Sequence, residues 1–377
     1  MDASELDYEL PSSAISQVPA EPRDSARLLV DTGATSPPRH LRVADLPDLV
    51  GPGDVVVVND TRVIPARLHL SKPTGGAVEV LLLERRADGW WEALVRPSRR
   101  VAPGTRLTPA RPPRPGLRSG SGDAPGGPGS GQDLVVEVGE VLGVDGRRRV
   151  VLHGGVGDDD LAVLDGAGEV PLPPYIHEPL ADADRYQTVY ADHPGSVAAP
   201  TAGLHLTRSV LHRCQAAGAA VARVDLAVGL GTFRPMTTER VEDHPMHAER
   251  YRIPPETVAL LAHRGRGPAF GPRHAVPGAD ERRARVLAVG TTVVRALESW
   301  SATGVTEGST SLFIHGDHRF AMVDRLLTNF HVPRSSLLAM VEAFVGPHWR
   351  DLYAEALAEG YRFLSFGDAM LLDGAST

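Results

Sequence analysis

Two histidines and a carboxylate stand close together in the segment His244-Pro245-Met246-His247-Ala248-Glu249. This composition is typical of metal ligands. The prolines at 245 and 254 favour an extended chain, in which His247 and Glu249 share a face while His244 points away. The spacing therefore favours a His247/Glu249 acid–base pair over a three-ligand metal site, with a solvated polar loop as the plain alternative.

Two glycine-rich turns follow apolar segments that we predict to be strands. One turn is 228–233, with Gly229, Gly231, Thr232 and Phe233, and the other is Gly290-Thr291-Thr292. Glycine lets a ligand approach the backbone closely, and ligands bind at the carboxyl ends of parallel strands. The first turn is not a dinucleotide fingerprint, because position 234 is arginine. A shared pocket and two structural turns are both open interpretations.

Further polar segments stand at the ends of predicted elements. Thr201, Gly203 and His205 precede a predicted helix, where an imidazole could lie over a ligand or the residues could simply cap the helix. His331 precedes another helix, and the segment 365–370 lies near the C-terminus. Asp60 follows four valines, and a polar group ending a buried strand favours a strand-end site.

The elements that position these residues fall into two groups. Residues 55–107 and 134–154 predict short strands joined by tight turns at 87–89 and 144–146, which is typical of a small antiparallel barrel or sandwich. Between these strands, residues 109–132 are rich in proline and glycine and predict a disordered loop.

From about residue 160, predicted strands alternate with predicted helices, which indicates a mostly parallel sheet covered by helices. We therefore expect an α/β catalytic domain of residues 1–64 and 160–377. The barrel-like domain of residues 65–159 is expected to be inserted after the first strand. A second low-complexity stretch, 264–285, is expected to be a surface loop.

The composition fits a globular chain of about two domains, with 377 residues of which 42% are hydrophobic. A single cysteine, Cys214, excludes an internal disulfide and multi-cysteine zinc motifs. The N-terminus resembles no signal peptide, and the apolar runs are too short to span a bilayer, so we expect a cytoplasmic protein without a membrane. The net charge of −8 means that a nucleic-acid partner needs a local basic face.

The segments above, in their order, resemble the S-adenosylmethionine:tRNA ribosyltransferase-isomerase family of queuosine biosynthesis. The matching blocks include PGDVVVVNDTRVIPARL, VAAPTAGLHLT, VGLGTF, MHAERY, LAVGTT, TNFHVPRSSLL and YRFLSFGDAML, and the resemblance runs from Asp7 to about Leu372. It implies an α/β domain with an inserted barrel, S-adenosylmethionine as co-substrate, and no metal. The implied partner is a tRNA with a queuosine-type anticodon.

The resemblance also implies the reaction. The ribosyl group of S-adenosylmethionine moves to 7-aminomethyl-7-deazaguanine at the tRNA wobble position and rearranges, giving epoxyqueuosine while adenine and methionine leave. A base must remove a proton beside the sulfonium, and Asp60, His247 and Glu249 are candidates. His205 and His331 are candidates for the acid that protonates adenine.

The chemistry of this reaction and the positions of the segments, not family assignments, indicate the expected binding residues. Adenosine or methionine is expected at the glycine turns, with Thr201 and Gly203 beside them and Phe233 near the cation. The residues expected to meet tRNA phosphates are Arg62, Arg67, Arg96, Arg99, Arg100 and the one lysine, Lys72.

The chain departs from the family at Ala227, where histidine is usual, and at Phe366, where tyrosine is usual. These departures leave open a diverged enzyme that uses S-adenosylmethionine with a non-tRNA acceptor. A metal-dependent hydrolase using His244, His247 and Glu249 is an alternative of another class, and a non-catalytic RNA-binding module is a third.

Overall fold

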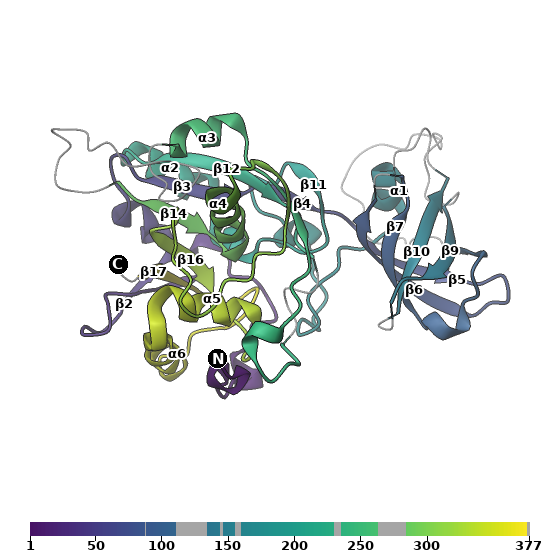
Figure 1. Cartoon of the computed structure of the whole chain (residues 1–377), viewed down its shortest axis with the longest axis horizontal. Coiled ribbons are helices and arrows are strands. Elements are labelled where there is room, and N and C mark those ends of the chain that lie inside the picture. The colour runs from purple at the N-terminus through teal and green to yellow at the C-terminus, as the bar shows by residue number, and fades with distance from the viewer. Residues whose placement is uncertain are drawn as a thin grey trace. The chain divides into compact units, whose positions relative to one another are not determined.

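The computed structural model describes residues 1–86, 88–110, 134–143, 146–154, 160–229, 235–262 and 284–374. The chain forms two compact units, which are Met1–Arg62 with Pro173–Thr377, and Val63–Leu172 (Figure 1). The boundary predicted at 159 lies earlier than the observed one, because α1 (Asp160–Ala167) belongs to the second unit. There Asp160 accepts hydrogen bonds from Arg85 and from the indole of Trp91.

A mixed nine-stranded sheet forms the centre of the first unit. Its strands are, in spatial order, β15 (Glu307–Thr310), β13 (Glu249–Arg252), β12 (Ala220–Leu226), β3 (Val55–Asn59), β14 (Val286–Val289), β16 (Arg325–Asn329), β17 (Ala369–Asp373), β1 (Arg27–Val30) and β2 (Arg39–Arg42). The four central strands β12, β3, β14 and β16 run parallel. A separate two-stranded sheet pairs β4 (Thr61–Val63) with β11 (His193–Ser196).

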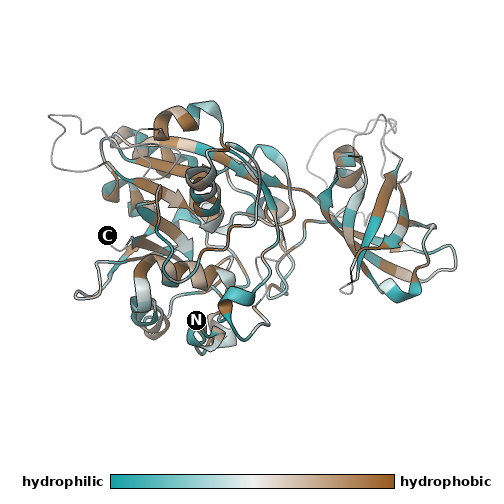
Figure 2. Ribbon diagram, in the orientation of Figure 1, coloured by the Kyte–Doolittle hydropathy of each residue, from teal (hydrophilic) through white to brown (hydrophobic). Residues whose placement is uncertain are grey.

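Both faces of this sheet are covered, as the unbroken run of valines in β3 requires. Val55 and Val57 pack into one core and Val56 and Val58 into the other, following the alternation of side chains along a strand. Figure 2 shows the apolar residues gathered along these strands. The helices of the first unit are α2 (Arg208–Ala216), α3 (Pro255–Leu261), α4 (Thr291–Thr303), α5 (Ser336–Val345) and α6 (Trp349–Ala358).

Short 3-10 turns complete the described helical segments. They are η1 (Ala3–Leu6), η2 (Ser12–Ala14), η3 (Arg23–Ser25), η4 (Val43–Leu49), η5 (Ser98–Arg100), η7 (Ala183–Tyr186), η8 (Thr201–His205), η10 (Val241–Asp243) and η11 (Gly346–His348).

The second unit is a closed antiparallel barrel. Its strands are, in spatial order, β10 (Arg147–His153), β7 (Trp91–Arg96), β6 (Ala77–Arg85), β5 (Arg67–Ser71), β8 (Thr105–Pro109) and β9 (Val135–Val141). The guanidinium of Arg148 is buried and donates to the carbonyl oxygens of Gly139, Ser98 and Val101. Its charge is thus taken up by backbone dipoles within the barrel wall.

The fold class predicted from the sequence is confirmed, since the chain combines a sheet covered by helices with an antiparallel barrel. The point of insertion is different, because β1, β2 and β3 all precede the barrel. Most of the two low-complexity stretches, 109–132 and 264–285, lies outside the described residues, which omit 111–133 and 263–283. Within the described part of the chain, none of the helices has the length and apolar character that crossing a membrane requires.

Candidate active site

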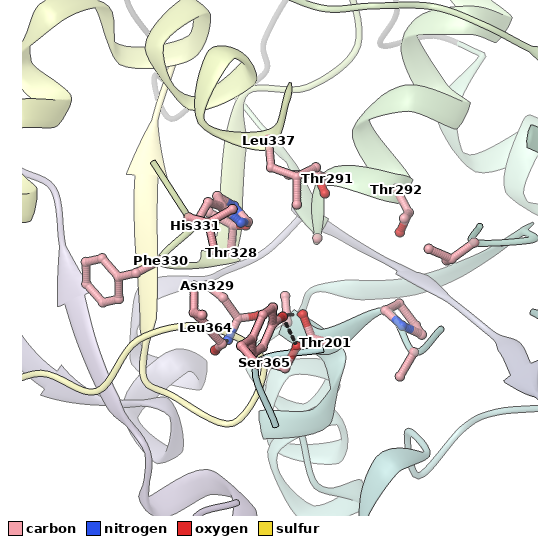
Figure 3. Close-up of a pocket in the computed structure, with 17 residues that line it drawn as sticks. Thr201, Thr291, Thr292, Thr328, Asn329, Phe330, His331, Leu337, Leu364 and Ser365 are labelled. Atoms are coloured by element: carbon pink, nitrogen blue, oxygen red, sulfur yellow. Dashed lines mark hydrogen bonds between the residues drawn. The ribbon is translucent and has the colours of Figure 1, made fainter. Parts of the chain in front are cut away.

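A pocket opens at the carboxyl ends of the parallel strands of the first unit (Figure 3). It has about 550 Å³ of space free of protein atoms, part of it open to solvent. Its walls come from the ends of β12, β14 and β16, from η8 and from the segment before β17. The lining includes Thr201, Gly290, Thr291, Thr292, Thr328, Asn329, His331, Leu337, Leu364 and Ser365. The edge of the sheet that the sequence indicated is therefore the edge that carries the pocket.

Asn59, at the end of β3, joins the strand ends beside this pocket. Its Nδ2 donates to the carbonyl oxygen of Leu226 at 3.0 Å and to Thr292 Oγ1 at 3.2 Å. Its Oδ1 accepts from the backbone N–H groups of Leu226 and Thr61. The side chain is fully buried. One amide thus holds β12, β3 and the first turn of α4 in a fixed relation.

Asn329, at the end of β16, has the same function on the other side. Its Oδ1 accepts from Thr201 Oγ1 at 2.9 Å, and its Nδ2 lies 2.9 Å from His205 Nε2. Nδ2 also lies 3.2 Å from the carbonyl oxygen of Leu364 and 3.4 Å from that of Asp368. Three segments far apart in the chain therefore meet at one buried amide.

His205 lies beneath the pocket rather than in its lining. It is 4% exposed, and burial lowers its pKa to about 4, with the nearby Asp368 opposing that shift. The imidazole is therefore neutral near pH 7 and is hydrogen-bonded to Asn329. This position suits a group that supports the pocket better than one that protonates a ligand.

His331 does line the pocket. Its Nε2 lies 2.9 Å from Thr328 Oγ1, and Figure 3 shows the two side chains next to each other. Its backbone is held by Tyr353, whose hydroxyl accepts from the His331 N–H, and by Tyr8, whose hydroxyl donates to the His331 carbonyl. Burial lowers the pKa of His331 to about 3, so the ring is neutral near pH 7.

Tyr175 is a lining residue that the sequence reasoning did not single out. Its hydroxyl lies 2.7 Å from Ser365 Oγ, and burial raises its pKa to about 12. The side chain is half-buried, unlike the other aromatic lining residue, Phe330, which is fully buried and stacks on Phe363. The only signal in the sequence is the block LPPYI, which has no residue of obvious reactivity.

The lining of the pocket is electrically neutral. Among the described residues that form it, none is an aspartate, glutamate, lysine or arginine. Its polar groups are hydroxyls, one amide, one phenol and one imidazole whose pKa lies far below 7. Leu364 holds a positive φ of 69°, a backbone conformation that costs about 1–3 kcal/mol for a non-glycine residue and clusters at functional sites.

The predicted His247/Glu249 pair does not form. Glu249 is 6% exposed and lies in β13, where its Oε1 accepts from the Gly229 N–H at 3.0 Å and its Oε2 accepts from Arg295. His247 precedes the strand and is exposed. The prediction failed because the regular alternation that it assumed begins only at Glu249.

The same contacts contradict a metal site made of His244, His247 and Glu249. Both oxygens of the carboxylate already accept hydrogen bonds from protein groups. Burial lowers the pKa of His244, with His247 contributing, and the ring packs against Phe313 at 5.7 Å. We therefore assign Glu249 to holding the turn after β12 in place.

Asp60 is buried, but it is not among the lining residues. Its oxygens lie 3.4 Å from His193 Nδ1 and 3.7 Å from the guanidinium of Arg223. Burial raises the pKa of Asp60, and the neighbouring Asp225 adds to the shift while His193 and Arg223 oppose it. Asp60 does directly follow the buried strand β3, but its carboxylate contacts His193 and Arg223, neither of which lines the pocket.

Asp60, Asp192 and His193 place ligand atoms within 4.8 Å of one another, a spacing that a metal ion could use. The surroundings do not favour a cation, because Arg252 lies 2.8 Å from His193 Nε2 and Arg223 lies beside Asp60. A guanidinium only donates, so Nε2 accepts and Nδ1 carries the proton that faces Asp60. We assign no metal to this group.

The predicted glycine positions have different surroundings. Gly290 lines the pocket with a φ of 91° and stands directly before α4, as the turn prediction requires. Gly203 serves packing instead, because a Cβ there would lie 2.2 Å from Tyr190 Oη. Gly229 is held by Glu249, whereas the predicted Gly231, Thr232 and Phe233 lie outside the described residues.

The predicted RNA-binding residues lie in both units. Arg96, Arg99 and Arg100 are exposed on the barrel, and the ammonium of Lys72 donates to the carbonyl oxygen of Arg100. These four residues form a basic cluster at β7, η5 and the turn after β5. Arg67 also belongs to the second unit and is half-buried, whereas Arg62 is exposed in the first unit.

Comparison with known proteins gives matches along nearly the whole chain. The family model described as "Queuosine biosynthesis protein" matches residues 3–372. A protein named S-adenosylmethionine:tRNA ribosyltransferase-isomerase from Rubrobacter xylanophilus is 48% identical, covering 99% of this chain and 98% of that protein. One of the same name from Thermus thermophilus is also 48% identical, over 97% of this chain and 98% of that protein.

A solved structure is similar as well. It is the crystal structure of S-adenosylmethionine tRNA ribosyltransferase from Thermotoga maritima, which is 33% identical, covers 98% of this chain and 99% of that chain, and has a TM-score of 0.49.

Proposed function

The chain belongs to the queuosine biosynthesis protein family, and on that premise we propose that it is an S-adenosylmethionine:tRNA ribosyltransferase-isomerase. It transfers the ribosyl group of S-adenosylmethionine to 7-aminomethyl-7-deazaguanine at the tRNA wobble position and isomerises it. The products are epoxyqueuosine-tRNA, adenine and methionine. The observation that carries this proposal is the match of 48% identity across both units to relatives of that name. The reaction takes place in the cytoplasm, where its tRNA substrate is found.

The neutral pocket supports S-adenosylmethionine as the ligand of the first unit. A nucleoside is uncharged, so it needs no counter-charge, whereas a phosphate-bearing nucleotide would need a cation that the described lining does not offer. The half-buried ring of Tyr175 gives a flat surface for a purine or for the face of a sulfonium. The adenosyl half of the ligand is thus the part that fits.

Among the described residues, two titratable side chains line the pocket, and we assign the proton transfers to them. The sulfonium acidifies the adjacent C5′ protons, one of which must be removed, and adenine leaves readily only when it is protonated. Near pH 7 His331 is unprotonated and Tyr175 is protonated, which are the forms that accept and donate a proton. Burial weakens His331 as a base and Tyr175 as an acid, so the assignment requires that the bound ligand bring both pKa values closer to 7. His205, Asp60 and Glu249 act from outside the lining. The chemistry needs no metal.

The basic cluster on the barrel supports a tRNA partner. The chain is acidic overall, with a formal charge of −8, so phosphate binding must be local. Lys72, Arg96, Arg99 and Arg100 give such a local surface within the second unit. Exposed guanidinium groups can donate two parallel hydrogen bonds to a phosphate, which suits them to an RNA backbone.

The departures from the family pattern are compatible with this function. Ala227 is half-buried, and its backbone N–H donates to the Arg250 carbonyl within the sheet edge, so that position keeps its fold without a histidine. Phe366 is buried, and its ring packs edge-on against Tyr186 at 5.9 Å. Both changes lie outside the lining residues.

The test is to incubate the purified protein with S-adenosylmethionine and tRNA that carries the aminomethyl-deazaguanine base. Mass spectrometry should detect free adenine, methionine and epoxyqueuosine in equal amounts. The matched control is the same tRNA with guanine at the wobble position, which should give none of them. Turnover should fall in His331→Asn and Tyr175→Phe. Glu359→Gln changes an exposed residue outside the pocket lining and should match the wild type.

Two results would contradict the proposal. If the protein does not bind S-adenosylmethionine, the proposed ligand is wrong. If it binds S-adenosylmethionine but leaves the modified tRNA unchanged, the acceptor is wrong, and small primary amines become the substrates to examine.

A further inference from the structure

The orientation of the Asn329 amide is set by its backbone neighbours. One end of the amide faces the carbonyl oxygens of Leu364 and Asp368, at 3.2 and 3.4 Å. Carbonyl oxygens only accept hydrogen bonds, so the end that faces them must be the NH₂ group. The oxygen of the amide therefore points to Thr201, whose Oγ1 lies 2.9 Å away. Asn329 is only 2% exposed, so solvent does not supply an alternative hydrogen-bond partner for its amide.

This orientation determines the polarity of Thr201. An amide oxygen only accepts, so the Thr201 hydroxyl must donate its single proton to it. The proton is then no longer available to a ligand, and only the lone pairs of Oγ1 remain. Thr201 lines the pocket, as Figure 3 shows.

We propose that Asn329 makes Thr201 an obligate hydrogen-bond acceptor, through which the pocket selects a donor group on the nucleoside half of its ligand. The inference rests on the proposed function for the identity of that ligand. Thr201 is then a specificity-determining residue, and Asn329 is the residue that positions it. The donor is either the 6-amino group of adenine or a ribose hydroxyl.

The neutrality of the pocket restricts the donor to the nucleoside half. The α-ammonium of the methionine half is charged and would lie here without a carboxylate among the described lining residues. A 6-oxo purine would set an acceptor against the acceptor of Thr201, so the site would reject it. A site that pairs a buried acceptor with a donor on its ligand rejects analogues without that donor more strongly than a site that recognises shape alone.

The first test needs no ligand. With Nδ2 facing the backbone carbonyls, Asn329 donates to His205 Nε2, so the imidazole carries its proton on Nδ1. Long-range ¹H–¹⁵N spectra of histidine-labelled protein should show an unprotonated Nε2 and a protonated Nδ1 for His205, identified by its loss in His205→Gln. A protonated Nε2 would mean that the amide is reversed, and it would overturn the inference.

The second test measures the binding of S-adenosylmethionine and four analogues by calorimetry. Three of these lack the 6-amino group, the 2′-hydroxyl or the 3′-hydroxyl, and the fourth carries a 6-oxo group. The wild type should bind one deletion analogue about 2- to 13-fold more weakly than S-adenosylmethionine, the effect of one net hydrogen bond. Which analogue this is tells whether the amine or a ribose hydroxyl is recognised. If it is the amine, the 6-oxo analogue should lose more than the 6-deamino one.

Two variants separate recognition from folding. Thr201→Val keeps the shape but has no oxygen, so it should bind that deletion analogue and S-adenosylmethionine equally. Thr201→Ser keeps the hydroxyl and should retain the wild-type preference. If Thr201→Val keeps the full preference, the inference fails while the proposed function stands. If the wild type binds no S-adenosylmethionine, the proposed function fails and this assignment of the donor fails with it.

Discussion

The ion pair between Glu249 and Arg295 gives the sharpest prediction, because the sequence suggested a catalytic role for Glu249 and the structure gives it a positioning role. Both side chains are buried, at 6% and 4% exposure. Arg295 also donates to the carbonyl oxygens of Leu312 and Thr310, each at 3.1 Å. Glu249→Gln changes one atom and keeps an oxygen for the Gly229 N–H, but it places an NH₂ group against the guanidinium or leaves Gly229 without its acceptor.

The magnitude follows from leaving a buried charge without its partner, which costs about 3–5 kcal/mol. A domain is stable by only about 5–15 kcal/mol, so the loss is a large fraction of the total. At roughly 2–4 °C per kcal/mol for a domain of this size, the unfolding temperature of Glu249→Gln should fall by roughly 6–20 °C.

The assay is differential scanning calorimetry, with urea unfolding to confirm the free energy. Glu359→Gln is the matched control, because Glu359 is 52% exposed and lies 3.9 Å from Arg27 in the same unit. Such a surface pair contributes about 0–1 kcal/mol, so this variant should unfold close to the wild type. The double variant Glu249→Gln/Arg295→Met should lose less stability than the sum of the single changes, because it removes the stranded charge as well.

One result would refute this reasoning. If Glu249→Gln unfolds within about 2 °C of the wild type while its turnover collapses, the carboxylate is not a structural partner of Arg295. Glu249 would then return as the candidate base, and the ion pair seen here would not describe the working enzyme.

Three further predictions follow from single contacts. Burial lowers the pKa of His331 from 6.5 to about 3, so below pH 6.5 the unfolded chain binds more protons than the folded one, and the free energy of unfolding decreases as the pH is lowered. In urea unfolding, the wild type should therefore lose more stability between pH 7 and pH 4.5 than His331→Asn does, by roughly 2–3 kcal/mol. Gly203→Ala should lower stability by about 1–3 kcal/mol in thermal unfolding, because its Cβ would lie 2.2 Å from Tyr190 Oη. Adding Tyr190→Phe should restore part of the lost stability. If it restores none, the clash is not with the Tyr190 hydroxyl. Replacing Arg99 and Arg100 by alanine should weaken tRNA binding in filter assays and reduce the slope of log affinity against log salt by about 1 per lost phosphate contact, whereas an unchanged slope would remove them from the interface.

Much of the fold was predictable because its signals are local. The valines of β3, the turn between β6 and β7, and the helical spacing of α2 and α4 each depend on residues close in the chain. The insertion point was harder to predict, since β1 and β2 have only four residues each: β2 is largely exposed, and the buried run in β1 is too short to identify a strand. The extent of the barrel unit was missed because the contacts of Asp160 connect residues about 70 positions apart.

The candidate site was only partly predictable. The sequence placed Gly290 after a predicted strand and Thr201 and His331 before predicted helices, and the structure brings all three into the lining of one pocket. It missed Tyr175, because a tyrosine in a proline-rich connection has no local mark of function. It also proposed Glu249 as a base, because a carboxylate beside a histidine looks the same in a sequence whether or not an arginine faces it.

The sequence by itself therefore determined the type of the elements with a strong local pattern, the edge of the sheet where the glycine turns lie, and the family. The tertiary structure alone decided what each polar group can do there. Whether a carboxylate is free or ion-paired, whether a histidine is charged, and whether a threonine donates or accepts all depend on partners such as Arg295 for Glu249 and Asn329 for Thr201. Those partners lie 46 and 128 positions away in the chain, and only folding brings them within hydrogen-bond distance.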